Sequence, residues 1–231
     1  MQDLRESRLI ARSILERRGQ LAFKPVTSAK WVNIKRSWSG LLHVQIEHDT
    51  VHGCTPAMLK WWFENIARTT TWDGFGFNGP LVSFYHLWHH RDHVAVTPLT
   101  GSEVGFIEGG YTRVTEQFND FHEMINVDSV TDRLDETEFT FSVRILGMVV
   151  CRIIHFYEPE KDGSRFFAET VVGSEIPVIG WLFNWLIAPF IYSKTTGENW
   201  IRHNIEETGR SESIIPPLYD HYVTKAEKKQ S

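Results

Sequence analysis

The sequence is poor in cysteine. Its 231 residues include only two, Cys54 and Cys151, which lie far apart and fit no Cys-x-x-Cys spacing. Neither a disulfide framework nor a thiolate zinc site is therefore expected. Cys54 stands just before a predicted helix, where the pKa of a thiol can be lowered. A free cysteine is more often a small buried residue, and that is the role we expect.

Positive charge and targeting features are also scarce. The net charge is −5, so no surface basic enough to follow a phosphate backbone is predicted, and nucleic acid is not an expected partner. Near the N-terminus, Asp3, Glu6 and Glu16 stand among arginines without an apolar run, which is atypical of a secretory signal or a transit peptide. We therefore expect a cytoplasmic location.

One long run has no charge at all. Ile176–Tyr192 is slightly short for a membrane span, and Pro177, Gly180, Asn184 and Pro189 interrupt it. We expect a buried helix, as the wall or the lid of a pocket, without stable membrane insertion. A membrane-associated protein that uses this run is the weaker alternative.

The pattern that is present predicts an α+β protein. A helix begins near Thr55, a good N-cap, with Pro56 in its first turn. A polar helix is expected from about residue 193 to 208, where Gly209 would end it. Alternating apolar segments separated by turn residues predict an antiparallel meander, and the strands are expected at 41–48, 111–117, 120–130, 136–146, 148–157 and 164–173. A sheet curled around a long C-terminal helix is a helix-grip arrangement, which encloses a cavity.

The expected organisation has three parts. Residues 1–40 form an N-terminal helical arm, 41–215 a helix-grip catalytic domain, and 216–231 a tail. Within the arm, residues 2–18 read as a helix with a modest apolar stripe, and 24–40 as an irregular stretch. Such a helix has little to bury alone, so it should dock on the main domain or on a second subunit. We expect a homodimer.

The stretch Tyr85–His93 contains four of the eleven histidines. His93 enters an apolar strand directly behind Asp92, and a nearby carboxylate can orient a metal-binding imidazole. His93 is therefore a candidate metal ligand. The other histidines of the stretch are more often surface or packing residues: His86, His89 and His90.

Two further places offer ligands. His203 and Glu207 are four residues apart on the polar helix and share one face; they are either an exposed pair or two groups that point into the cavity. Glu123 alternates with Phe121, Ile125 and Val127 on one strand face. An acid on an apolar face needs a partner or a cation, unless that face is turned outward. Two histidines with two carboxylates favour zinc, with manganese or iron as lesser options.

These motifs together resemble the 2,4-diacetylphloroglucinol hydrolases and the related phloretin hydrolases, over roughly residues 40–210. The resemblance rests on Gly53–Phe63, on Tyr85–His93, on Glu123, and on His203-x-x-x-Glu207. It implies a Bet v 1-like helix-grip domain. It also implies zinc bound by four residues and a substrate-orienting tyrosine, and the positions are His93, Glu123, His203 and Glu207 for the metal and Tyr85 for the substrate. Those enzymes carry Asn where this chain has Val96, which leaves the exact substrate open.

The predicted function is zinc-dependent hydrolysis of the carbon–carbon bond between an aryl ring and an acyl carbonyl, in acylated polyphenols such as acylphloroglucinols. The substrate would be a small aromatic ketone, with Tyr85 and Glu123 as catalytic residues. The main alternative is a non-enzymatic binding protein for a hydrophobic aromatic ligand, because the helix-grip fold also serves carriers.

Overall fold

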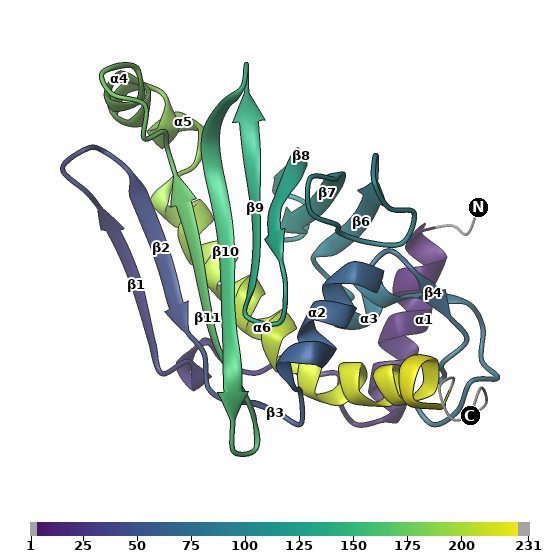
Figure 1. Cartoon of the computed structure of the whole chain (residues 1–231). Helices are drawn as coiled ribbons and strands as arrows, with labels where there is room; N and C mark the ends of the chain where they lie inside the picture. Colours follow the sequence, from purple (N-terminus) through teal and green to yellow (C-terminus); the bar gives the residue numbers. More distant parts are fainter. Residues whose placement is uncertain (1–3, 226–231) are drawn as a thin grey trace.

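The apolar segments that alternate along the chain assemble into one large antiparallel sheet in the computed structural model, which describes residues 4–225 (Figure 1). The long strands are β1 Trp31–Arg36, β2 Leu42–Glu47, β6 His93–Pro98, β7 Tyr111–Phe118, β8 Glu123–Leu134, β9 Glu138–Ile145, β10 Met148–Glu160 and β11 Gly163–Val172. Three two-residue strands are β3 Val51–His52, β4 Thr69–Thr70 and β5 Val82–Ser83. The helices are α1 Leu4–Arg17, α2 Pro56–Asn65, α3 Phe84–Trp88, α4 Ile179–Leu186, α5 Ala188–Ile191 and α6 Lys194–Tyr219, with single turns at Val26–Ser28 and Asp220–Thr224.

The sheet is a meander with the N-terminal hairpin added at one edge. Its order is β1-β2-β11-β10-β9-β8-β7-β6, and β3 also pairs with β11. Helix α6 crosses the sheet and continues beneath α2 (Figure 1). The α+β helix-grip class predicted from the sequence is therefore confirmed.

Two elements differ from the prediction. The stretch 24–40, expected to be irregular, contains β1, which pairs with β2 from Trp31↔Glu47 to Arg36↔Leu42. Helix α6 does not end at Gly209. This glycine lies inside the helix and packs against Lys24, since a Cβ there would lie 2.8 Å from the Lys24 side chain. The helix continues to Tyr219 because burial of its apolar face outweighs the prolines in its last turns. The predicted tail is thus helical at its start, and residues 226–231 lie outside the described part.

Helix α1 docks on the main domain, one of the two alternatives expected for it. Ala11, Ile14 and Leu15 are buried, and α1 lies against α3 and β5. The Ser7 hydroxyl accepts the backbone N–H of Ser83 at 2.9 Å and lies 2.8 Å from His86 Nδ1. The arm therefore helps to fix the segment that leads to His93.

The structure also confirms the predictions for the Cys54 thiol and for the start of helix α2. This thiol is buried, and burial raises its pKa to about 12, so the packing role is confirmed. Thr55 caps α2 by accepting the Met58 backbone N–H at 3.3 Å, and Pro56 occupies the first turn.

The uncharged run at 176–192 folds as α4 and α5, and the expectation that it is buried is wrong. Val178, Leu186 and Phe190 are among its exposed residues. The expectation of a pocket wall is confirmed, because Phe183 and Tyr192 line the cavity between the sheet and α6. Among residues 4–225, no helix combines the length and the apolar character needed to cross a bilayer.

Candidate metal centre

A cavity of about 310 Å³ lies between the sheet and α6. Apolar and aromatic side chains line most of it, among them Phe63, Phe106, Phe139, Phe141, Ile153 and Trp200. One group of polar residues lies together on its lining: Tyr85, Glu116, His203, Asn204 and Glu207. The cavity thus joins a large apolar space to a compact set of titratable groups.

His93 is placed by a short helix and its cap. Ser83 accepts the Tyr85 backbone N–H at 3.2 Å and starts α3. The chain then turns so that His93 begins β6, fully buried. Its Nδ1 lies 2.6 Å from the Tyr85 carbonyl oxygen, and the two rings stack at 3.6 Å between centroids. When Nδ1 donates to this carbonyl, Nε2 is left as the free, metal-binding nitrogen.

His203 and Glu207 lie one turn apart on α6 and both point inward. They are 2% and 5% exposed, so the alternative of a solvated surface pair is wrong. Glu207 Oε2 lies 3.2 Å from His93 Nε2 and 3.5 Å from His203 Nε2. Its Oε1 accepts from the Asn204 amide at 2.8 Å, and Asn204 Oδ1 in turn lies 3.0 Å from His48 Nε2. The sequence-predicted residues His93, His203 and Glu207 therefore meet in one place.

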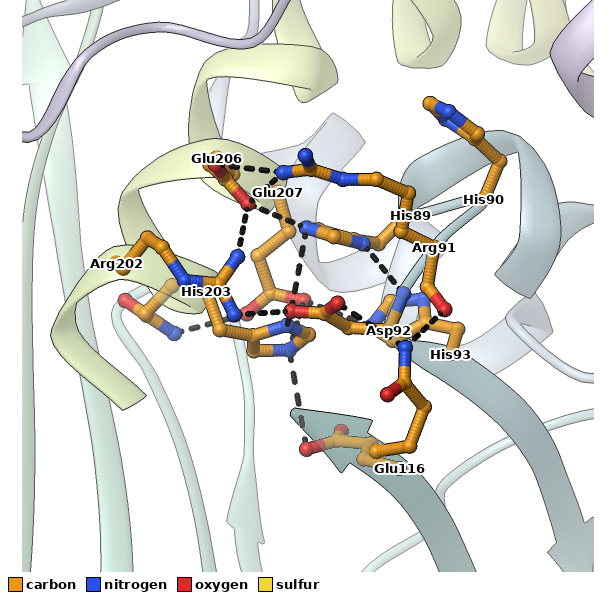
Figure 2. Close-up of polar contacts among 12 residues, drawn as sticks. His89, His90, Arg91, Asp92, His93, Glu116, Arg202, His203, Glu206 and Glu207 are labelled. Atoms are coloured by element: carbon orange, nitrogen blue, oxygen red, sulfur yellow. Dashed lines mark hydrogen bonds and ion pairs between the residues drawn. The ribbon is translucent and has the colours of Figure 1, made fainter. Parts of the chain in front are cut away.

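The sheet adds a second carboxylate, Glu116, which the sequence reading missed. β6 and β7 pair so that His93 stands opposite Glu116. Glu116 Oε2 lies 3.7 Å from His203 Nε2, and Oε1 accepts the Tyr85 hydroxyl at 2.8 Å. One ligand atom from each of His93, Glu116 and His203 fits within 4.8 Å of the others. Figure 2 shows these side chains converging from β6, β7 and α6.

The structure does not bring Glu123 into this cluster. Glu123 begins β8, where it is paired with Phe118, whereas the residue opposite Glu116 is Ile125. The predicted inward face is correct, since Ile125 lines the cavity. Register places Glu123 farther along the sheet, where its carboxylate accepts from Asn199 at 2.8 Å. The inward alternation of Val114, Glu116 and Phe118 was the signal that could have identified the right acid.

A second layer orients the cluster. Asp92, expected to orient His93, instead lies 3.2 Å from His203 Nδ1 and accepts from Arg202 at 2.9 Å. Arg202 also donates to Glu206, whose carboxylate lies 2.9 Å from His89 Nε2. His203 is thereby held with Nε2 toward Glu116 and Glu207, as a carboxylate-oriented ligand would be.

The remaining histidines of the Tyr85–His93 stretch have the expected packing role, but none is on the surface. His86, His89 and His90 are all buried. His86 Nε2 lies 3.0 Å from the Val94 carbonyl oxygen. His90 stacks on Phe23 and points away from the cluster (Figure 2).

Charge at the cluster is unbalanced. Burial lowers the pKa of His203, but Glu116, Glu207 and Asp92 outweigh it and raise that pKa to about 9. Burial raises the pKa of Glu207 to about 8, against the opposing effect of His203. The pKa of His93 is lowered well below its usual value, by burial first and then by His203. Near neutral pH, the raised pKa values therefore leave a proton on Glu207 and an imidazolium at His203, and a bound cation would replace that positive charge.

The donor set can hold a divalent metal. Two imidazole nitrogens and two carboxylates suit zinc, and all four residues lie on strands or in the middle of a long helix. A second group, formed by His89, Asp92 and His203, also lies close together. It uses His203 Nδ1 and a carboxylate that already accepts from Arg202, so it is better described as the support of the first group.

Three buried polar atoms of cavity-lining residues have no hydrogen-bond partner within the described residues: His155 Nδ1, Thr170 Oγ1 and Tyr192 Oη. A buried polar atom without a partner is costly. These atoms are therefore points where a ligand in the cavity can form hydrogen bonds.

No protein-family model matches the chain, and no curated protein matches its sequence. Protein Ms6760 from Mycobacterium smegmatis is 11% identical, with 83% of this chain and 99% of that chain covered and a TM-score of 0.43. Ara h 8.0201 is 12% identical, with 74% and 97% covered and a TM-score of 0.42. An AHSA1-like protein from Aeromonas hydrophila is 13% identical, with 74% and 92% covered and a TM-score of 0.40. Likenesses at this level carry no information on ligand or activity.

Proposed function

We propose that this chain is a zinc-dependent hydrolase that cleaves the carbon–carbon bond between an aryl ring and an acyl carbonyl in acylated polyphenols such as acylphloroglucinols. The observation that carries the proposal is the convergence of His93, Glu116, His203 and Glu207 at an apolar cavity. The cavity volume lies at the lower end of the range of about 300–1,000 Å³ for small-molecule sites, which suits a single substituted ring.

The residues present fit zinc. Nε2 of His93 is left free by the Tyr85 carbonyl, and His203 is oriented by Asp92. Glu116 and Glu207 supply oxygen ligands. Glu116 takes the position that the family resemblance had placed on Glu123. When bound, zinc supplies a Lewis acid that activates water and polarises a carbonyl group.

The chain's own residues position the substrate. Aromatic walls at Phe63, Phe139 and Phe141 can pack against a phenol ring and exclude water from the rest of the cavity. Tyr85 donates to Glu116, so its oxygen keeps lone pairs that can accept a ring hydroxyl. The unpartnered atoms of His155 and Tyr192 can bind further hydroxyls on the ring.

The reaction balances as a hydrolysis. One water adds its oxygen to the acyl carbon, the bond from that carbon to the ring breaks, and the ring carbon gains a proton. The products are a carboxylic acid and the free polyphenol. Ortho hydroxyl groups make the ring a tolerable leaving group because they stabilise negative charge on it. Glu207 can hold a proton at the polar part of the cavity, since burial raises its pKa to about 8.

The test combines metal analysis of the purified protein with a screen of acylated phenols, in which formation of the deacylated phenol is followed. We expect about one zinc per chain and turnover of at least one acylphenol. Protein that carries no zinc after exposure to it, or that shows no turnover with zinc bound, would contradict the proposal.

A second candidate is a non-enzymatic carrier of a hydrophobic aromatic ligand, favoured by the predominantly apolar lining of the cavity. A carrier has no use for stoichiometric zinc. Tight binding of an aromatic ligand that is unaffected by zinc, together with no turnover, would favour this reading.

A further inference from the structure

One end of the molecule exposes large apolar side chains on three separate segments. Helices α4 and α5 carry most of them, and the exposed residues there are Val178, Ile179, Trp181, Leu182, Trp185, Leu186, Ile187, Phe190 and Ile191. Trp38, in the turn between β1 and β2, is 88% exposed, and Leu146, in the turn between β9 and β10, is fully exposed. We call these residues the apolar end.

The three segments form one surface. The Asn184 amide donates to the Ser39 carbonyl at 3.0 Å, and the Arg36 guanidinium lies 5.8 Å from the Trp185 ring centroid. Both contacts join α4 to the turn that holds Trp38. Gly147 and Ile176 line one shallow groove, which joins the β9–β10 turn to the approach to α4. Figure 1 shows α4, α5 and the two turns at the same end of the sheet.

The most exposed side chains of α4 and α5, among them Leu186 and Phe190, lie outside the hydrophobic core. α4 is anchored by buried Asn184, which accepts the Ser174 backbone N–H at 2.7 Å, and by Phe183 against the core. The remaining face of α4 is turned to solvent. Contiguous exposed apolar surface of this kind marks an interaction site.

This end also frames the mouth of the cavity. Ile145 and Ile191 line the cavity and are nevertheless exposed. Because cavity lining and outer surface meet at these residues, an apolar molecule could pass from the apolar end into the cavity without crossing a polar barrier.

The surroundings fit a lipid surface better than a protein partner. The most exposed side chains, Trp38, Leu146 and Phe190, project singly from different segments. Helices α4 and α5 have no charged residue. Beside them, the Arg36 guanidinium packs near the Trp185 ring and donates to the Gly40 and Asn184 backbone carbonyls, and within residues 4–225 it forms no ion pair with a carboxylate. Aromatic and aliphatic side chains beside cations are the pattern of helices that lie in a bilayer interface.

We propose that the apolar end docks on the surface of an anionic lipid bilayer, with α4, α5 and the two turns inserted into its interface and the cavity mouth facing the acyl chains. This inference concerns where the protein takes up apolar ligands, and it does not depend on the chemistry proposed for the metal centre.

The test is flotation with vesicles of phosphatidylcholine containing about one third phosphatidylglycerol, compared with phosphatidylcholine alone. Wild-type protein should float with the anionic vesicles and more weakly with the neutral ones. Phe190→Asp and, separately, Leu146→Asp should each lower vesicle affinity by at least about tenfold, because a carboxylate replaces an inserted apolar group. Phe75→Asp is the matched control, since Phe75 is also highly exposed but lies in the loop between β4 and β5, close to α1.

The unfolding temperature of each variant should match that of the wild type, because the replaced side chains are exposed. Wild-type protein that stays unbound, or an equal loss in Phe75→Asp, would overturn the proposal. A change from dimer to monomer in Phe190→Asp without vesicles would also overturn it, and would make the apolar end a contact between copies of this chain.

Discussion

The two ends of the cavity each depart from the usual pattern of buried apolar and exposed charged side chains. At the metal-centre end, charged groups such as Glu207 and His203 are buried, whereas at the apolar end, Trp185 and Phe190 are exposed. Burying a charge and exposing a large apolar patch are each unfavourable in isolation. In the two proposals above, a bound cation would offset the cost at the metal-centre end and a lipid surface the cost at the apolar end.

The largest change is expected in zinc affinity, when a ligand at the metal-centre end is removed. His203→Ala should lower zinc affinity by more than about hundredfold, because it removes a ligand, and loss of even a supporting group costs about 10–100-fold. Affinity would be measured by competition with a chromophoric chelator. Leu146→Asp, at the other end, is the control and should leave zinc affinity unchanged. Undiminished affinity in His203→Ala would remove this residue from the site.

Tyr85→Phe should have a smaller effect, on catalysis. It tests whether the Tyr85 hydroxyl acts on the substrate or helps to hold the metal. It removes one hydrogen bond to Glu116 and little volume. We expect kcat/KM on an active acylphenol to fall about tenfold to a hundredfold, as a lost hydrogen bond to a charged group predicts, with zinc content unchanged. Wild-type activity would reduce Tyr85 to a packing role, and loss of zinc would mean that its hydroxyl is needed to hold the metal.

The pH dependence of stability should also distinguish the metal-free from the zinc-loaded protein. The folded-state pKa of His203 is raised from 6.5 to about 9, and that of Glu207 from 4.5 to about 8. A raised pKa contributes stability that is complete below the unfolded-state value and is lost as pH rises through the folded-state value. The unfolding temperature of metal-free protein should therefore fall as the pH rises from 4.5 to about 8 for the Glu207 contribution and from 6.5 to about 9 for the His203 contribution, and these contributions should level off above that.

Zinc should flatten this dependence, because the bound cation replaces the protons that hold the cluster together. Differential scanning calorimetry across this range, with and without a chelator, is the measurement. Equal pH dependence in both states would indicate that zinc does not bind at His203 and Glu207.

The smallest effect is expected at the apolar end. Phe190→Ser should change the free energy of unfolding by less than about 0.5 kcal/mol, as exposed substitutions usually do. Phe84, fully buried against Trp62, is the contrasting position, where replacement by Ala should cost about 3–5 kcal/mol. Chemical denaturation would measure both. A large cost at Phe190 would show that α5 is part of the core.

Sequence alone predicted much of the metal centre where spacing determines geometry. His203 and Glu207 follow from the period of a helix, and His93 from its place before a strand. The second carboxylate, Glu116, depended on which residues of neighbouring strands stand opposite each other, and register is not visible in one sequence. Glu116 and Glu123 both face inward, so only the pairing of His93 with Glu116 distinguishes them.

The apolar end shows the complementary limit. A run that is apolar all round shows no hydrophobic periodicity, so the sequence does not reveal which side is buried and which is exposed. Ile176–Tyr192 therefore indicated a pocket wall but not an exposed surface. The fold class was more predictable, because the meander of alternating segments and the terminal helix each carry a distinct period. β1 was missed because its alternation is weak and both its faces are partly exposed.

The most direct test of the account is the zinc content of three purified proteins after exposure to zinc and removal of the excess: wild type, Glu116→Gln and Glu123→Gln. Each substitution preserves shape and removes one charge. We expect about one zinc per chain in the wild type and in Glu123→Gln, with most of the metal lost in Glu116→Gln, because only Glu116 contributes a ligand. Full zinc content in Glu116→Gln, or its loss in Glu123→Gln, would contradict the metal centre described above.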